Sequence, residues 1–251
     1  MNKIKVTHAG AVRTVTLARA EKRNALDQEM LAGLRAAFGE APGEAERVVV
    51  LRAEGSVFCA GLDLTERRGT LSEPSGIEEM LHAVESFPLP VVAVVQGDAI
   101  AGGNELALHC DFVVAAATAR FGMSLAQIGL VPTWFLAKKL LEVAGPVATR
   151  EILLLGDLLP APRMRELGII GRAVPPAELQ AAAQAVIDRL AANAPLSLQA
   201  MKALINRQMA FRDAIAHTDI DRQVGRARDS VDAREGIAAR LERRQPNFVG
   251  R

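Results

Sequence analysis

The segment PVVAVVQGDAIAGGNELALHCD, residues 90–111, decides the fold of this chain. It starts with a continuous apolar run, residues 91–95, which is typical of a strand buried on both faces. The pair Gly102-Gly103 then opens a short helix, predicted over residues 105–110. Glycine lets a backbone approach a ligand closely, and the free N–H groups at a helix start favour negative charge. We therefore expect a ligand site at this turn.

A second glycine turn lies upstream, and it too comes after a predicted buried strand. Another buried strand is predicted over residues 47–51, and it leads into Cys59-Ala60-Gly61-Leu62-Asp63. A helix is predicted between the two strands, near residues 77–87. The order strand, helix, strand implies right-handed crossovers and a mostly parallel sheet. In such a sheet both turns present backbone N–H groups to a ligand.

The N-terminal part completes the predicted sheet. Residues 4–8 and 12–17 alternate like a β-hairpin, and Asp27 is a good N-cap for a helix that ends at Phe38. Residues 65–79 are charged and rich in Gly, Pro and Ser. Because they come directly after the upstream glycine turn, a plain solvated loop and a mobile lid are both open interpretations.

The C-terminal half is predicted to be helical. Pro132 and Pro146 suit first helical positions, and we expect two or three helices after Pro195. The chain is thus predicted to hold an α/β core over residues 1–194 and a helical region over residues 195–251.

Composition excludes several classes of protein. Lys plus Arg number 30 and Asp plus Glu number 29, so the formal net charge is +1 and no basic footprint for nucleic acid is expected. The two cysteines, Cys59 and Cys110, fit no metal-binding spacing and are expected to be buried thiols. The N-terminus lacks the apolar region of a secretory signal, and no apolar stretch is long enough for a bilayer, so we expect a cytoplasmic protein without a membrane partner. Motifs of serine hydrolases, zinc proteases, P-loop proteins and Rossmann dehydrogenases are absent from the sequence.

Glu105 is a carboxylate in an otherwise apolar helix start, and its local sequence leaves two interpretations open. It could be a first-turn acidic residue that the helix dipole favours. It could equally be a partly buried general acid/base whose pKa is tuned by desolvation. His109 lies four residues later on the same helical face, where a satisfied core histidine is the simpler interpretation.

At this point the sequence resembles a known family. Residues 90–111 and the run Phe58-Cys59-Ala60-Gly61-Leu62-Asp63-Leu64 closely resemble the signatures of the crotonase superfamily, the enoyl-CoA hydratases and isomerases. Further likeness at residues 21–26, 119–122 and 230–236 extends the resemblance over essentially the whole chain. It implies a crotonase-like α/β fold, a spiral of ββα units with a C-terminal helical oligomerisation region.

The resemblance also implies roles for individual residues. The N–H groups of Leu62 and Gly102 would bind the thioester oxygen, with Glu105 as the acid/base of the catalytic set. Loss of one such donor costs about 2.7–4 kcal/mol in comparable oxyanion holes. The residues expected to bind the substrate are Arg23, Ala25, Ala60, Gly61, Asp63, Gly103 and Leu125.

One position departs from the family pattern. Hydratases of this superfamily hold a water between two glutamates, and Leu125 stands in the place of the second. A leucine cannot orient or deprotonate water, so isomerisation, decarboxylation of a malonyl-type thioester and slow hydration by Glu105 alone all remain open. We expect a hydratase/isomerase-type enzyme, with isomerisation favoured over hydration. The alternatives are an acyl-CoA decarboxylase of the same superfamily and a catalytically silent acyl-CoA-binding oligomer.

The resemblance implies one class of small-molecule partner and one kind of assembly. The partner is an acyl-CoA, in which CoA belongs to the substrate, so no cofactor and no metal are expected. The assembly is a homotrimer or hexamer packed through the C-terminal helices.

Overall fold

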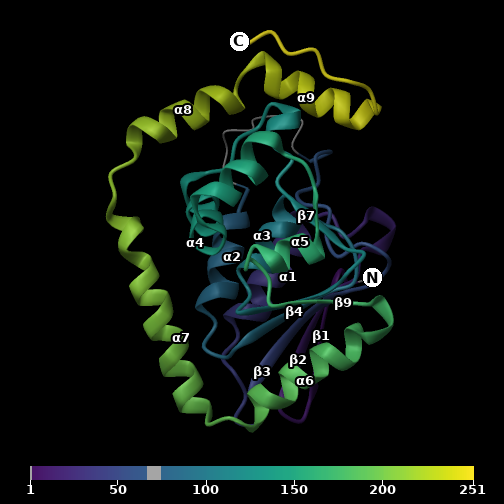
Figure 1. The fold of residues 1–251 in the computed structure, drawn as a ribbon, viewed down its shortest axis with the longest axis vertical. Coiled ribbons are helices and arrows are strands. Elements are labelled where there is room, and N and C mark those ends of the chain that lie inside the picture. The colour runs from purple at the N-terminus through teal and green to yellow at the C-terminus, as the bar shows by residue number, and fades with distance from the viewer. Residues whose placement is uncertain (1, 67–74) are drawn as a thin grey trace.

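A computed structural model describes residues 2–66 and 75–251 of the chain. Eight residues of the predicted lid, 67–74, lie outside the described part. Figure 1 shows an α/β body with a helical arm along one side and a further helix across its top. The strands are β1 Ile4–Ala9, β2 Val12–Leu17, β3 Val48–Ala53, β4 Val91–Val95, β5 Ala99–Ile100, β6 Phe112–Ala116, β7 Arg120–Gly122, β8 Leu159–Pro160 and β9 Arg172–Val174.

The helices alternate with these strands in the first half and dominate the second half. The α-helices are α1 Gln28–Gly39, α2 Ile77–Ser86, α3 Gly102–Leu108, α4 Trp134–Arg150, α5 Ala161–Glu166, α6 Leu179–Ala192, α7 Pro195–Met209, α8 Thr218–Arg228 and α9 Val231–Glu242. The short turns are η1 Ala20–Lys22, η2 Ala126–Ile128, η3 Glu151–Leu155, η4 Pro176–Glu178 and η5 Ala210–Ala214.

The main sheet has six strands in the order β1-β2-β3-β4-β6-β9. The β1–β2 hairpin is antiparallel and every other pair in this sheet is parallel, as the strand-helix-strand order predicted. Successive residues of β3 and β4 face opposite sides. Val49 and Leu51 join the larger core on one face, whereas Val48 and Val50 pack with α6 on the other. The uninterrupted apolar runs are therefore explained by burial on both faces.

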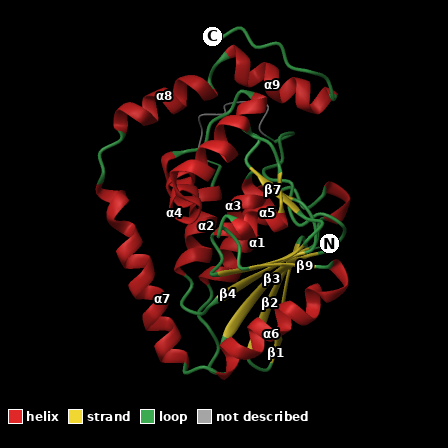
Figure 2. Cartoon of the chain, viewed as in Figure 1, coloured by secondary structure: helices red, strands yellow, loops and turns green. Residues whose placement is uncertain are grey.

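A second, three-stranded sheet in the order β5-β7-β8 carries the turn before α3. Its strands have two or three residues each, which is too short for an alternation to be visible in sequence. Figure 2 shows α6 against one face of the large sheet, while α7 and α8 run outside the body and α9 crosses above it.

The structure corrects one predicted helix start and bears out two others. Pro132 precedes α4 by two residues, because the N-cap is Thr133, whose side chain accepts from the Leu136 N–H. Pro146 does begin a helical segment, since α4 breaks at Gly145, where φ is 67°. The N-cap role of Asp27 is confirmed by its bond from the Met30 N–H at 2.9 Å.

Candidate active site

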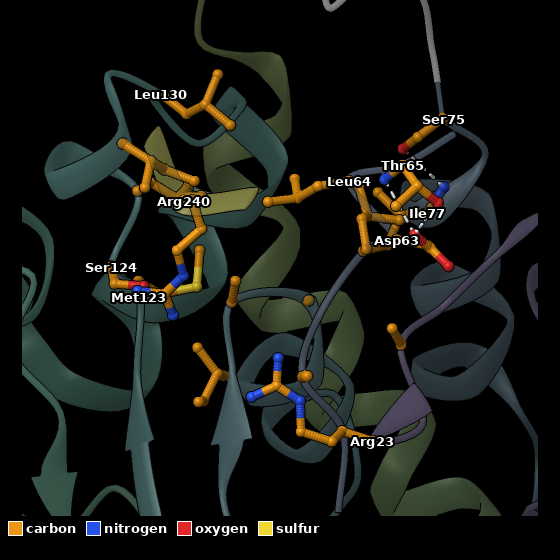
Figure 3. A pocket seen from close by; sticks show the side chains of 18 of the residues that line it. Arg23, Asp63, Leu64, Thr65, Ser75, Ile77, Met123, Ser124, Leu130 and Arg240 are labelled. Atoms are coloured by element: carbon orange, nitrogen blue, oxygen red, sulfur yellow. Dashed lines mark hydrogen bonds between the residues drawn. The ribbon is translucent and has the colours of Figure 1, made fainter. Parts of the chain in front are cut away.

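A cavity of about 850 Å³ opens where the two glycine turns meet. Its floor comes from residues 60–65 and from residues 100–102, and one wall comes from the start of α2. The opposite wall is the segment between β7 and α4, with Met123, Ser124 and Leu130 (Figure 3). A volume of this size suits a small-molecule ligand. The cavity thus has the start of α2 on one side and the segment that begins at Met123 on the other.

Two backbone N–H groups at the floor are free to bind a ligand. Within residues 2–66 and 75–251, the Leu62 N–H has no backbone acceptor, although the neighbouring N–H of Asp63 bonds to the Leu26 carbonyl at 2.9 Å. Gly102 is the first residue of α3, so its N–H lies outside the helical ladder. A Cβ built on Gly102 would stand 3.5 Å from the Leu62 nitrogen, which shows how close the two groups are.

Close backbone packing holds these two N–H groups together. Gly61 has φ +91°, and a Cβ there would lie 3.0 Å from the Ile100 carbonyl oxygen. Gly103 is tighter, because its Cβ would stand 2.2 Å from the Cys59 carbonyl oxygen. Ala101, between the two turns, takes a φ of 50°, a strained conformation for a residue with a side chain. Gly61 and Gly103, which were expected to bind the substrate, do not line the cavity. Their lack of a side chain instead lets the two turns pack closely against each other.

Glu105 lies one turn into α3 and is fully buried. It is not part of the cavity lining, and neither carboxyl oxygen has a hydrogen-bond partner among the described residues. Burial raises the pKa of the Glu105 carboxyl to about 8, and the positive charge of Lys139 offsets only part of that effect. The carboxyl is therefore mostly protonated at neutral pH, and it is more deeply buried than its sequence suggested.

Titratable side chains from α2, from α4 and from the C-terminal end of α3 lie near this carboxyl. The His109 Nδ1 lies 3.9 Å from a Glu105 oxygen and 2.8 Å from the Glu105 backbone carbonyl, to which it can donate. Burial lowers the pKa of His109 to about 4, so the ring is neutral at physiological pH. Lys139 pairs with Glu85 and lies 3.9 Å from Glu142. The described carboxylates nearby are thus engaged by Lys139, and none bonds to Glu105.

Leu125 stands on the wall opposite α2, half-buried and in contact with the cavity. It begins the turn η2, and its carbonyl accepts the N–H groups of Ile128 and Leu130. Its side chain adds an apolar surface at the position where the resemblance to hydratases implies a glutamate that activates water.

The predicted CoA-binding segment folds into a fixed loop at the cavity. Arg23 and Asn24 both adopt positive φ, at 53° and 52°. The buried Asn24 side chain bonds to the carbonyls of Glu54 and Val57, each at 2.9 Å, which ties this loop to the end of β3. Arg23, Ala25 and Ala60 all line the cavity.

Asp63 lines the cavity but is occupied by its own turn. It accepts the backbone N–H and the hydroxyl of Thr65 and pairs with Arg19 at 2.8 Å. Burial alone would raise the pKa of Asp63, but these bonds hold it below its usual value. A permanently ionised, fully engaged carboxylate is suited to hold the turn, not to exchange protons.

Sequence reasoning missed the contribution of the C-terminal helices. Cavity-lining residues include Arg228 of α8 and, at α9, Arg240, Leu241 and Arg243. The region after Pro195 showed no motif with chemistry, and only the fold brings it over the turns. A basic excess near the C-terminus was the one available signal.

The family model for enoyl-CoA hydratase/isomerase matches residues 7–251. The chain belongs to the enoyl-CoA hydratase/isomerase family. A probable enoyl-CoA hydratase of Mycobacterium bovis is 34% identical over 248 residues, which cover 98% of this chain and 99% of the relative. The 1,2-epoxyphenylacetyl-CoA isomerase of Escherichia coli is 32% identical over 255 residues, covering 96% and 95%.

Solved structures of this family share the whole fold. Methylmalonyl-CoA decarboxylase in complex with 2S-carboxypropyl CoA superposes with a TM-score of 0.92 at 25% identity, covering all of this chain and 99% of that one. The crotonase-like α/β fold predicted from the sequence is thereby confirmed, and the chain is an enzyme of the hydratase/isomerase type.

Two features are absent from the described residues. These residues hold no group of three or more His, Cys, Asp or Glu side chains that could bind a metal ion. None of their helices is long and apolar enough to cross a membrane.

Proposed function

We propose that this enzyme moves the double bond of an enoyl-CoA thioester through an enolate. The Leu62 and Gly102 N–H groups would bind the thioester oxygen, and Glu105 would carry the proton. The observation that carries this proposal is the pair of N–H groups that close glycine packing holds one helical turn from a buried carboxyl. Neither the N–H groups nor the carboxyl has a hydrogen-bond partner among the described residues. Preorganised donors of this kind stabilise charge that develops in a transition state.

The reaction balances with one carboxyl group. Ionised Glu105 takes a proton from C2 of a 3-enoyl thioester, and the electron pair of that C–H bond forms the enolate held by the two N–H groups. The now protonated carboxyl returns the proton to C4, so that the double bond moves between C2 and C3. A raised pKa suits this role, because a base with a pKa near the working pH is efficient in both directions.

Hydration is the less favoured chemistry because the second carboxylate is missing. Leu125 presents an apolar side chain to the cavity, and the described carboxylates near Glu105 are held by Lys139. Among the described residues, no second carboxylate bonds to Glu105.

Decarboxylation is the second candidate, and the structural neighbours favour it. Methylmalonyl-CoA decarboxylase superposes over the entire chain. Loss of CO2 from a malonyl-type thioester also yields a thioester enolate, which needs the two N–H groups to hold its oxygen and a single proton donor at C2. Protonated Glu105 is suited to that donation.

The CoA part of the substrate would bind at the basic side of the cavity. Lys22, Arg23 and Arg243 are basic residues of the cavity lining. Cationic side chains and loop N–H groups are the usual partners of phosphates. CoA enters as part of the substrate, and the proposal needs no cofactor or metal. A cytoplasmic location stays a prediction of the sequence.

We also propose that the chain works as a homo-oligomer, a trimer or hexamer. The support is a set of large apolar side chains that α7 and the neighbouring segments leave exposed: Leu196, Met201, Leu204, Ile205, Phe211 and Ile215. Extended exposed apolar surface of this kind marks interaction sites. Light scattering should give three or six times the 26.8 kDa chain mass, and a monomeric mass would contradict the proposal.

The activity test compares three substrates on the purified protein. Crotonyl-CoA reports hydration, a 3-enoyl-CoA reports isomerisation and methylmalonyl-CoA reports decarboxylation. We expect turnover of the 3-enoyl-CoA and its loss in Glu105→Gln. Acyl-CoA binding in calorimetry without turnover of any of the three would instead identify a silent binder.

A further inference from the structure

Helix α9 packs closely against the turn η2, which belongs to the cavity wall. A Cβ on Gly236 would lie 2.2 Å from the Ile128 carbonyl oxygen, and one on Gly129 would lie 2.6 Å from the Asp232 carbonyl oxygen. The two glycines let the backbone of the helix touch the backbone of the turn. Arg240 follows Gly236 by four residues, so it lies on the same helical face.

This contact directs the side chain of Arg240 into the cavity. Figure 3 shows its guanidinium beside Met123 and Ser124. These residues follow Gly122, whose carbonyl accepts the Ala101 N–H at 2.8 Å, next to the Gly102 donor. Arg240 therefore presents a positive charge to the cavity at the wall that adjoins the second glycine turn.

Arg240 carries this charge without a partner in the described part of the chain. Arg19 and Arg244, by contrast, are paired with Asp63 and Glu235. Lys22, Arg23 and Arg243 also line the cavity, and the proposed function assigns them to the CoA phosphates. The wall that the Arg240 guanidinium faces is partly apolar, because Met123 lies beside it (Figure 3) and Leu125 and Leu130 belong to the same wall of the cavity. A planar guanidinium in such a setting matches a carboxylate, which it can bind through two parallel hydrogen bonds.

We propose that Arg240 selects acyl-CoA substrates whose acyl chain carries a free carboxylate. The inference rests on the proposed function, because it names the substrate class of the same cavity. The carboxylate is an anchor for recognition: pairing with Arg240 stabilises it as an anion, so it is not the group that leaves.

The test is calorimetric binding of glutaryl-CoA and pentanoyl-CoA, two saturated thioesters with equally long chains that differ by one carboxylate. Neither can undergo hydration or isomerisation, so only binding is measured. Wild-type protein should bind glutaryl-CoA about tenfold more tightly. Arg240→Met should abolish this preference and leave the affinity for pentanoyl-CoA within twofold, whereas Arg240→Lys should keep part of the preference.

A matched control is Arg234→Met on the same helix, since the Arg234 side chain bonds to the Asp229 carbonyl, outside the cavity. It should keep the wild-type preference.

Binding of free CoA tests the alternative that Arg240 contacts the CoA phosphates and not a carboxylate of the acyl chain. If Arg240→Met weakened CoA, pentanoyl-CoA and glutaryl-CoA equally, Arg240 would be a phosphate contact and the inference would be wrong. A wild type without preference for glutaryl-CoA would also overturn it. Failure of every CoA compound to bind would instead refute the proposed function.

Discussion

The amide nitrogen of Leu62 and the α-carbon of Gly102 are so close that a methyl group on Gly102 would stand 3.5 Å from that nitrogen. The same methyl group would lie 2.9 Å from the Cδ1 of Ile77, the flexible end of a side chain that can move. We therefore expect Gly102→Ala to fold but to obstruct the oxygen-binding position. The kcat/KM for the best substrate should fall about a hundredfold or more, with a thermal midpoint within a few degrees of wild type. Unchanged activity would contradict this placement of the donors.

Gly103→Ala should behave in the opposite way. Its new Cβ would stand 2.2 Å from the Cys59 carbonyl oxygen, and neither backbone can yield without separating the two glycine turns. We expect a loss of several kcal/mol in the free energy of unfolding, in the range of severe core overpacking. Urea unfolding of the two alanine variants side by side measures the contrast. Equal stability of both would refute the packing argument.

The buried Glu105 should make the protein less stable as the pH rises. Because the folded pKa of about 8 exceeds the ordinary value of 4.5, the folded state binds a proton that the unfolded state has lost between these pH values. Stability therefore falls through this window, by roughly a few kcal/mol in total. Glu105→Gln should remove that slope and unfold at a higher urea concentration than wild type at pH 8. The difference should shrink towards pH 5, and an increase in that direction would contradict the assignment.

The pH dependence of the rate should separate the two leading reactions. In isomerisation Glu105 starts as a base, so kcat/KM should rise with pH and level off above about 8. In decarboxylation it starts as a proton donor, so the rate should fall over the same range. Rates measured from pH 6 to 9 show whether the rate rises with pH, as isomerisation requires, or falls, as decarboxylation requires. A flat profile in this range would exclude Glu105 from both roles.

Leu125→Glu should introduce hydration. The side chain is half-buried and borders the cavity, so a carboxylate there keeps access to solvent. We expect crotonyl-CoA hydration to increase at least tenfold, in line with the usual effect of a positioned general base. Leu125→Gln is the control, since it has the same shape without the charge. A gain of equal size in both variants would refute the missing-carboxylate explanation.

The sequence predicted those features that depend on local pattern. The runs of β3 and β4 gave two buried strands, and Asp27 marked the start of α1. The β5-β7-β8 sheet was not predictable, because strands of two or three residues leave no periodicity.

The site was predicted in part, for a similar reason. The two glycine turns indicated backbone N–H groups for a ligand. The local sequence did not indicate that Gly61 packs against Ile100 of the second turn and Gly103 against Cys59 of the first, and that neither lines the cavity. The burial of Glu105 and the approach of Arg240 depend on how α4 and α9 pack over the turns, which are contacts between residues far apart in the chain.

The central claim is that Leu62, Gly102 and Glu105 together remove a proton from the carbon next to the thioester. The most direct measurement follows by NMR a 3-enoyl-CoA that carries deuterium at both C2 positions. We expect wild-type protein to remove one C2 deuterium, which passes to C4 or to water, and Glu105→Gln to slow this loss at least a hundredfold. Loss of the deuterium at the wild-type rate in Glu105→Gln, or its retention at C2 in the wild type, would contradict the account.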